Sequence, residues 1–193
     1  MAVTDELSAH SEIAGVAEAA GQLGISRENL TDFTRTMIDL GETTNLSADE
    51  AATSLARFAN VMGTTQDEFD NIGSAIVGLG NNFATTEREI VDMSMRLAGA
   101  GRQADMTEGD VLGLATALSS VGIESEAGGT AFSRVITEMG IAVDTNSGKL
   151  ATFADVAGMS AQQFREAWAA DSGSAVSAFV EGMGRIQQSG ESL

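Results

Sequence analysis

A pattern that marks the start of a helix recurs five times in this chain and constrains its fold more than any other feature. Each instance has a Ser or Thr followed four positions later by an apolar or small residue, and in four of the five an apolar residue also precedes the Ser or Thr. The hydroxyl can accept a backbone N–H that the first helical turn leaves unpaired, and the flanking residues can form a hydrophobic staple. We therefore predict five helix caps: Ser26, Ser47, Thr65, Thr107 and Ser160.

Further residues mark how these helices begin and end. Three caps are followed by the acidic or amide residue that completes a capping box, as in Ser47 with Glu50, Thr65 with Glu68, and Ser160 with Gln163. Glycines follow the apolar stripes where a left-handed helix cap is expected. These predicted stops are Gly24, Gly41, Gly63, Gly80, Gly122 and Gly158.

Composition also favours helices over sheets. The chain has 22 glycines and no proline, the residue that most strongly breaks helix interiors. It has eight Phe, one Trp and no Tyr, with little β-branched alternation. We predict an all-α fold, a compact array of about eight to ten short helices joined by turns capped with Gly, Ser or Thr. The expected helices are 5–23, 27–40, 48–62, 66–79, 87–99, 108–121, 125–142, 150–157, 161–170 and 174–187.

One segment is the best candidate for a domain boundary. Residues 144–148, with the sequence DTNSG, are rich in turn-forming side chains. The boundary would divide the chain into a main helical domain, 1–143, and a smaller C-terminal helical part, 144–193, with a frayed polar end. The spacings between the five caps are uneven, so the sequence predicts no solenoid period.

The charge balance excludes several classes of partner. The chain has 28 Asp and Glu against 10 Lys and Arg, a formal net charge of −18, and its basic residues form no cluster. We therefore predict no stable nucleic-acid binding and no binding to anionic membranes. The best uncharged apolar run, 111–123, is too short to span a bilayer, and the chain start lacks the features of a signal peptide. The absence of cysteine excludes disulfides and thiolate chemistry.

Residues that could carry chemistry each have a simpler interpretation. His10 is the only histidine, so a Ser-His-Asp triad would depend on it, and a solvated surface position fits it better. Residues 99–104, GAGRQA, superficially match a dinucleotide fingerprint but follow a helix instead of a strand. The segment that begins at Asp144 starts like a calcium loop but has Lys149 at the glycine position. We predict no catalytic, metal-binding or cofactor-binding residues and no enzymatic activity.

Two further patterns, a carboxylate pair and a lone tryptophan, also have simpler structural interpretations. Some pair of carboxylates will lie at glycosidase separation by chance, but Glu124 and Glu126 would point apart on a helix. Trp168 lies four residues after Phe164, and core packing is a better interpretation for it than an anchor for a partner.

Two adjacent glycines indicate a centre of close packing. Gly128 and Gly129 fall inside an expected helix, where each costs roughly 1 kcal/mol relative to alanine. The missing side chains would let another helix, from this chain or a neighbour, cross at short distance. The alternative is that the glycines end one short helix and begin another. The predicted packing motif comprises Ala127, Gly128, Gly129, Thr130, Ala131 and Phe132.

Several blocks of sequence, in one order, resemble a known family. Residues 122–139, GIESEAGGTAFSRVITEM, resemble the most recognisable motif of the core region of bacteriophage tail tape measure proteins. Residues 21–41 (GQLGISRENLTDFTRTMIDLG), 46–63 (LSADEAATSLARFANVMG) and 97–122 (LAGAGRQADMTEGDVLGLATALSSVG) resemble that family too. So do residues 153–183, FADVAGMSAQQFREAWAADSGSAVSAFVEGM. The resemblance covers roughly residues 12 to 187.

The resemblance implies a structural and assembly segment of a tape measure protein. Such proteins lie inside the tail tube, set its length and leave it before DNA passes, and some help the genome to cross the cell envelope during ejection. The implied partners are tube, tip and tail assembly chaperone proteins and other copies of the chain. The implied location is the lumen or tip of the virion tail, after synthesis in the host bacterial cytoplasm. The alternatives are a cell-wall-degrading virion enzyme domain and an unrelated helical adaptor.

Overall fold

The computed structural model describes residues 13–189, and the regular secondary structure in this part of the chain is entirely helical. The prediction of an all-α array of short helices is confirmed. His10, the start of the expected helix 5–23 and the last residues of the expected frayed end, 190–193, lie outside the described residues. After a helical segment at 13–22, the helices are α2 (Leu30–Thr43), α3 (Ala48–Met62), η1 (Gln66–Glu68), α4 (Phe69–Asn82), α5 (Glu87–Gln103), α6 (Glu108–Ser120), η2 (Ser125–Gly129), α7 (Thr130–Thr145), α8 (Lys149–Ala157), α9 (Ala161–Ala170) and α10 (Ser172–Ser189).

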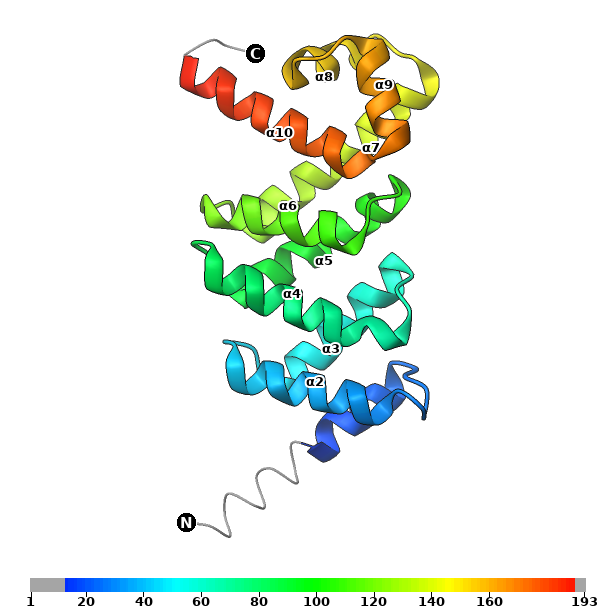
Figure 1. The fold of residues 1–193 in the computed structure, drawn as a ribbon, viewed down its shortest axis with the longest axis vertical. Helices are drawn as coiled ribbons and strands as arrows, with labels where there is room; N and C mark the ends of the chain where they lie inside the picture. Colours follow the sequence, from blue (N-terminus) through cyan, green and yellow to red (C-terminus); the bar gives the residue numbers. More distant parts are fainter. Residues whose placement is uncertain (1–12, 190–193) are drawn as a thin grey trace.

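The helices stack in two layers along the long axis of the molecule (Figure 1). In one layer α2 contacts α4, α4 contacts α6, and α6 contacts α10. In the other layer α3 contacts α5, and α5 contacts α7. The hydrophobic core runs between the layers, and α2 and α10 lie towards opposite ends of the stack. Phe33 of α2 and Phe69 of α4 meet edge to face there, with ring centroids 4.8 Å apart.

The stack contains an internal repeat that cap spacing alone did not predict. Pair α2–α3 and pair α4–α5 are related by a shift of 39 residues, which preserves apolar, capping and glycine positions. The spacing between successive caps does not display this period, because successive helices belong to alternate layers. The period of 39 residues relates each helix start to the second one after it. The pairs 39 residues apart include Ser26 and Thr65, Met37 and Ile76, Leu40 and Leu79, Gly41 and Gly80, Ser47 and Thr86, Glu50 and Glu89, and Ala59 and Ala98.

Three of the five expected caps have full capping-box geometry. The hydroxyls of Ser47, Thr107 and Ser160 each accept the backbone N–H of the third residue of the following helix. In each case the side chain of that third residue accepts the N–H of the cap. Thr86 has the same geometry with Glu89, although it was not among the predicted caps.

Neither Ser26 nor Thr65 makes a side-chain cap, for one shared reason, although Thr65 does occupy the N-cap position of η1. At both positions the chain forms a tight turn before the α-helix. In this turn the carbonyl oxygen of the Ser or Thr accepts the backbone N–H of the residue three positions later. The donors are Asn29 and Glu68, and both distances are 3.1 Å. Asn29 and Glu68 then take the N-cap positions of α2 and α4, and neither makes a side-chain cap. The structure shows no side-chain cap from Thr65 to η1.

Four of the six predicted glycine stops have left-handed backbone, namely Gly24, Gly63, Gly122 and Gly158. Gly41 and Gly80 were predicted wrongly, because α2 and α4 continue for two more residues after each of them. Space is a reason for glycine at Gly41, where a Cβ would lie 2.9 Å from the backbone nitrogen of Ala48. A Cβ on Gly80 would meet the flexible side chain of Glu87, with Oε1 as the nearest atom. Both glycines let a helix end pass close to the start of the next helix.

The C-terminal part of the stack is built from α8, α9 and α10, which contact one another. α7 continues through the proposed boundary and ends at Thr145, followed by Asn146 with φ of 50° and ψ of 42°. α10 contacts α6, and α8 contacts α7, so both layers continue into this part. The division of the chain at residue 144 stays a prediction.

Candidate packing and interaction surfaces

The glycine pair at 128–129 lies where α5 crosses the start of α7. Gly129 is buried at the end of the π-helical turn η2, and the chain continues directly into α7. A Cβ on Gly129 would lie 2.6 Å from Cβ of Arg96 and 3.2 Å from Sδ of Met93, both on α5. A Cβ on Gly128 would overlap the Cγ2 methyl of Ile123. The close approach is therefore made within this chain.

The rest of the predicted motif divides into two groups. Ala127, Thr130 and Ala131 are exposed, and the Thr130 hydroxyl donates to the carbonyl of Glu126. Phe132 is partly buried and packs against the core. Ser133, just beyond the motif, donates its hydroxyl to the carbonyl of Arg96 at 2.6 Å and holds α7 to α5. Close packing thus falls on the two glycines, with Ser133 as the residue that sequence analysis missed.

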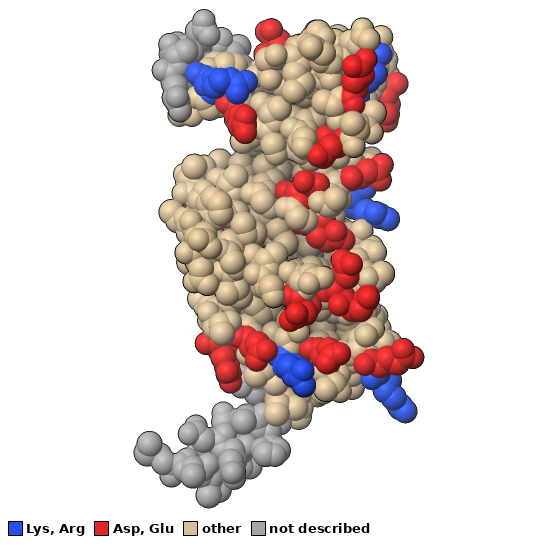
Figure 2. Space-filling view, viewed as in Figure 1, with Lys and Arg blue, Asp and Glu red and all other residues tan. Residues whose placement is uncertain are grey.

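Acidic side chains gather in a band along one side of the stack (Figure 2). Many acidic side chains of the described residues lie in helix first turns, because a carboxylate there is stabilised by unpaired N–H groups and by the helix macrodipole. First-turn acids include Asp49 and Glu50 of α3, Glu87 and Glu89 of α5, and Glu108 and Asp110 of α6. Much of the negative charge thus serves local helix initiation.

Glu50 has the most perturbed of these carboxylates. The Arg88 guanidinium donates to both of its oxygens, at 2.8 and 2.7 Å, and the Ser47 backbone N–H donates at 2.9 Å. The Arg88 hydrogen bonds, followed by those from Ser47, lower the pKa of Glu50 to about 2. Arg88 also donates to the carbonyl of Asn45. This cluster joins the starts of α3 and α5, which are neighbours in one layer of the stack.

A face without charge covers parts of α4 and α6. Residues 71–86 and 111–123 contain no charged side chain, although Asp, Glu, Lys and Arg make up 20% of the chain. The two helices are neighbours in one layer, and a broad area without charged side chains lies over them (Figure 2). Phe83 is 54% exposed and Val121 73% exposed at the helix ends. Elsewhere this face presents small or polar groups, so it is suited to packing more than to solvation by charge.

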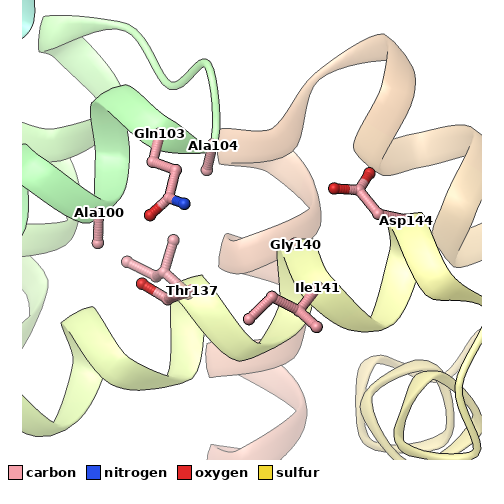
Figure 3. Close-up of a pocket in the computed structure, with 8 residues that line it drawn as sticks. Ala100, Gln103, Ala104, Thr137, Gly140, Ile141 and Asp144 are labelled. Atoms are coloured by element: carbon pink, nitrogen blue, oxygen red, sulfur yellow. The ribbon is translucent and has the colours of Figure 1, made fainter.

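The hollows between the described helices include the following three. One of about 60 Å³ lies between the end of α5 and α7, where Gln103 and Thr137 face each other (Figure 3). This volume is far below the roughly 300 Å³ at which small-molecule pockets begin. A more open hollow of about 490 Å³ lies beside Ile141 at the α7–α8 turn. The third, of about 380 Å³, is a groove between α2 and α4.

The residues weighed for chemistry occupy ordinary structural positions. Glu126 pairs with Arg96 at 3.6 Å, and Gly99 to Gln103 continue helix α5 instead of forming a loop. Trp168 is half-buried and stacks on Phe164, with ring centroids 6.2 Å apart. In residues 13–189 no group of three or more His, Asp or Glu side chains is placed to hold a metal ion. None of the helices described there is both long and apolar enough to cross a membrane.

These features define an acidic, all-α protein of stacked helix pairs, whose sequence signals serve helix capping and close helix packing. The family model described as phage-related minor tail protein matches residues 2–192. The chain belongs to this family, which places it among the structural proteins of phage tails. No curated protein and no solved structure matches the chain.

Proposed function

We propose that this chain is a segment of a tail tape measure protein and contributes to tail length by stacking repeated helix pairs. The observation that carries the proposal is the 39-residue shift that relates α2–α3 to α4–α5 along the long axis of the molecule. In a stack of this kind each repeat contacts its neighbours only and adds a fixed increment of length. That property suits a protein whose length is read out by the structure assembled around it.

The other parts of the proposal follow from a tail location. The partners are tube, tip and tail assembly chaperone proteins and further copies of the chain. The site of action is the lumen or tip of the tail, and the chain is made in the host bacterial cytoplasm. A formal charge of −18 suits a protein that shares this space with DNA without binding it, because like charges repel.

We also propose a structural and not an enzymatic role. Among the described residues, the carboxyl groups whose pKa departs from the ordinary value all have it lowered, by helix-start hydrogen bonds or ion pairs. A general acid in a glycosidase needs a raised pKa. The lowered pKa values therefore favour a structural role, in which these carboxylates stabilise helices, over the alternative of a cell-wall-degrading enzyme.

Tail length in the phage that encodes this chain tests the proposal. The variant inserts a second copy of residues 27–65 after Thr65, which adds one helix pair in register. If the pair stacks as it does in this fold, the tail should lengthen by about 8–10 Å, the usual distance between packed helices. If the helices run end to end inside the tube, the gain should approach 60 Å, at about 1.5 Å per residue.

A same-length exchange is the control. Replacing residues 27–65 with a copy of residues 66–104 exchanges one 39-residue unit for another and should leave tail length as in the parent phage. Tail lengths would be measured by electron microscopy. Assembled tails of parental length from the duplication variant would overturn the proposed role in length.

A further inference from the structure

The groove between α2 and α4 has an apolar floor and a carboxylate towards each end. Leu40 is 2% exposed on the floor, beside Gly73 and the partly buried Val77. Asp70 lies in the first turn of α4, and Asp39 lies near the end of α2. The 39-residue repeat makes Asp39 of α2 equivalent to Gly78 of α4. Asp39 is therefore offset from Asp70 by eight residues along the helix direction. At 1.5 Å per residue, the two carboxylates are separated by about 12 Å along the groove.

The two glycines of the groove have different reasons to be glycine. A Cβ on Gly73 would lie 3.1 Å from Cγ2 of Thr36 and 3.4 Å from Cδ1 of Leu40, so its absence brings α4 close to α2. A Cβ on Gly78 would meet nothing within 4 Å. Glycine in a helix interior costs roughly 0.5–1 kcal/mol relative to alanine. Packing within this chain does not explain that cost at Gly78, where the missing side chain leaves the groove open.

The charges of the groove have no cation bound to them within the described part of the chain. None of the ion pairs there includes Asp39 or Asp70. Asp39 lies with Glu42 in the last five residues of α2, which has no basic residue in its last turn. Acidic groups are unfavourable at this negative end of the helix macrodipole. The groove therefore has a negative lining in which neither carboxylate forms an ion pair with a described residue, although Arg35 lies one turn before Asp39 on α2.

We propose that this groove binds an amphipathic helix of another protein, with basic side chains about two turns apart and small or apolar residues between them. Residues i and i+7 of a helix lie on one face, about 10.5 Å apart along its axis, which is close to the separation of the two carboxylates along the groove. The small residues between them would lie against Leu40 and Val77. Because the groove is lined by carboxylates, the side chains of the partner that reach it should be positively charged. The open space at Gly78 determines how large the residues of the entering helix can be.

The experiment measures binding of synthetic helical peptides to the full chain by fluorescence anisotropy. The probe peptide is based on Ala and Leu and has Lys at positions i and i+7. A second peptide has Glu at the two Lys positions, and a third has the two Lys on opposite faces. We expect only the first to bind well. Asp39→Asn should weaken it more than Asp70→Asn, because the macrodipole already compensates Asp70, with the double variant losing about fivefold or more.

Matched variants separate the groove from general attraction to an acidic chain. Gly78→Leu fills the groove and should weaken binding at least tenfold. Gly113→Leu makes the same change in α6, where a Cβ also meets nothing within 4 Å, and should bind like the parent. The pair Asp155→Asn with Glu166→Gln removes the same charge on α8 and α9 and should change little. Circular dichroism would confirm folding of each variant.

Three outcomes would overturn the proposal: absence of binding by the Lys peptide, equal binding of the three peptides, or equal weakening by Gly78→Leu and Gly113→Leu. The measurement uses the isolated chain and does not depend on tail length. If the groove does not bind the peptide, the proposed role in tail length is unaffected. If the role in tail length is refuted, the proposed binding at the groove is likewise unaffected.

Discussion

Gly129→Ala should destabilise the protein even though alanine is the better helix former. The new Cβ would lie 2.6 Å from Cβ of Arg96, an atom next to the α5 backbone that no rotamer change can move away. Carbon atoms in contact normally lie about 3.5–4.0 Å apart, so α7 and α5 must separate by roughly 1 Å at this point. Closely packed protein interiors resist such shifts, and overpacking typically costs about 1–3 kcal/mol of stability.

The gain in helix propensity offsets part of this cost. Alanine gains roughly 0.5–1 kcal/mol over glycine in a helix, so the net loss should be about 1–2 kcal/mol, and Gly129→Leu should lose more. Gly99→Ala in α5 is the matched control, because a Cβ there meets nothing within 4 Å. That variant should gain roughly 0.5–1 kcal/mol. The two alanine variants should thus shift stability in opposite directions.

Thermal melts monitored by circular dichroism at 222 nm would measure both effects. For a chain of this length about 1 kcal/mol corresponds to roughly 2–4 °C, so Gly129→Ala should lower Tm by a few degrees and Gly99→Ala should raise it. A Gly129→Ala protein that melts no lower than the parent would refute the reasoning. The motif would then be a helix break without close packing.

Three further predictions concern stability and chemistry. Ser47→Ala should cost about 0.5–2 kcal/mol because it removes a capping box, whereas Ser26→Ala should cost less, since the Ser26 carbonyl makes the turn; urea melts of both would show a reversed order if the caps are misassigned. Because the pKa of Glu50 is depressed from 4.5 to about 2, its contribution to stability is present above pH 4.5 and is lost as pH falls towards 2; the difference in Tm between the parent and Arg88→Met should narrow over that window, and a constant difference would contradict this assignment. A mobility shift with duplex DNA and a peptidoglycan zymogram should both be blank, and salt-sensitive binding or a cleared band would reverse the corresponding interpretation.

Local signals in the sequence predicted the helices well because capping is a local property. Ser47, Thr107 and Ser160 each need only a partner three residues on, which the sequence displays directly. Thr86 was missed although Glu89 and Ile90 follow it at the required spacing, because the residue before it is polar. That signal could have been found by accepting a polar residue before the cap, as was done for Thr65.

What the sequence could not show was the role of tertiary contacts at the helix starts. The Ser26 N–H donates at 2.7 Å to Oε1 of Gln66, whose Nε2 donates to the carbonyl of Gly24. Gln66 thus joins two successive units of the stack at a position where local pattern suggested only a cap. Gly41 was misassigned for a similar reason, since its small size is required by the backbone at the start of the next helix and not by its own backbone conformation. Gly80 lies in the same way beside Glu87 at the start of α5.

The repeat also accounts for part of the distribution of charge over the surface. Parallel stacking of α2, α4 and α6 brings their starts to one edge, and helix starts favour carboxylates. The acidic band is therefore a consequence of this arrangement. The uncharged face over α4 and α6 is not part of the repeat, because α2 carries Asp32, Arg35 and Asp39 in the same layer. If the chain contributes to tail length as proposed, an added helix pair in register would extend the acidic edge by one unit, and the uncharged face would stay confined to α4 and α6.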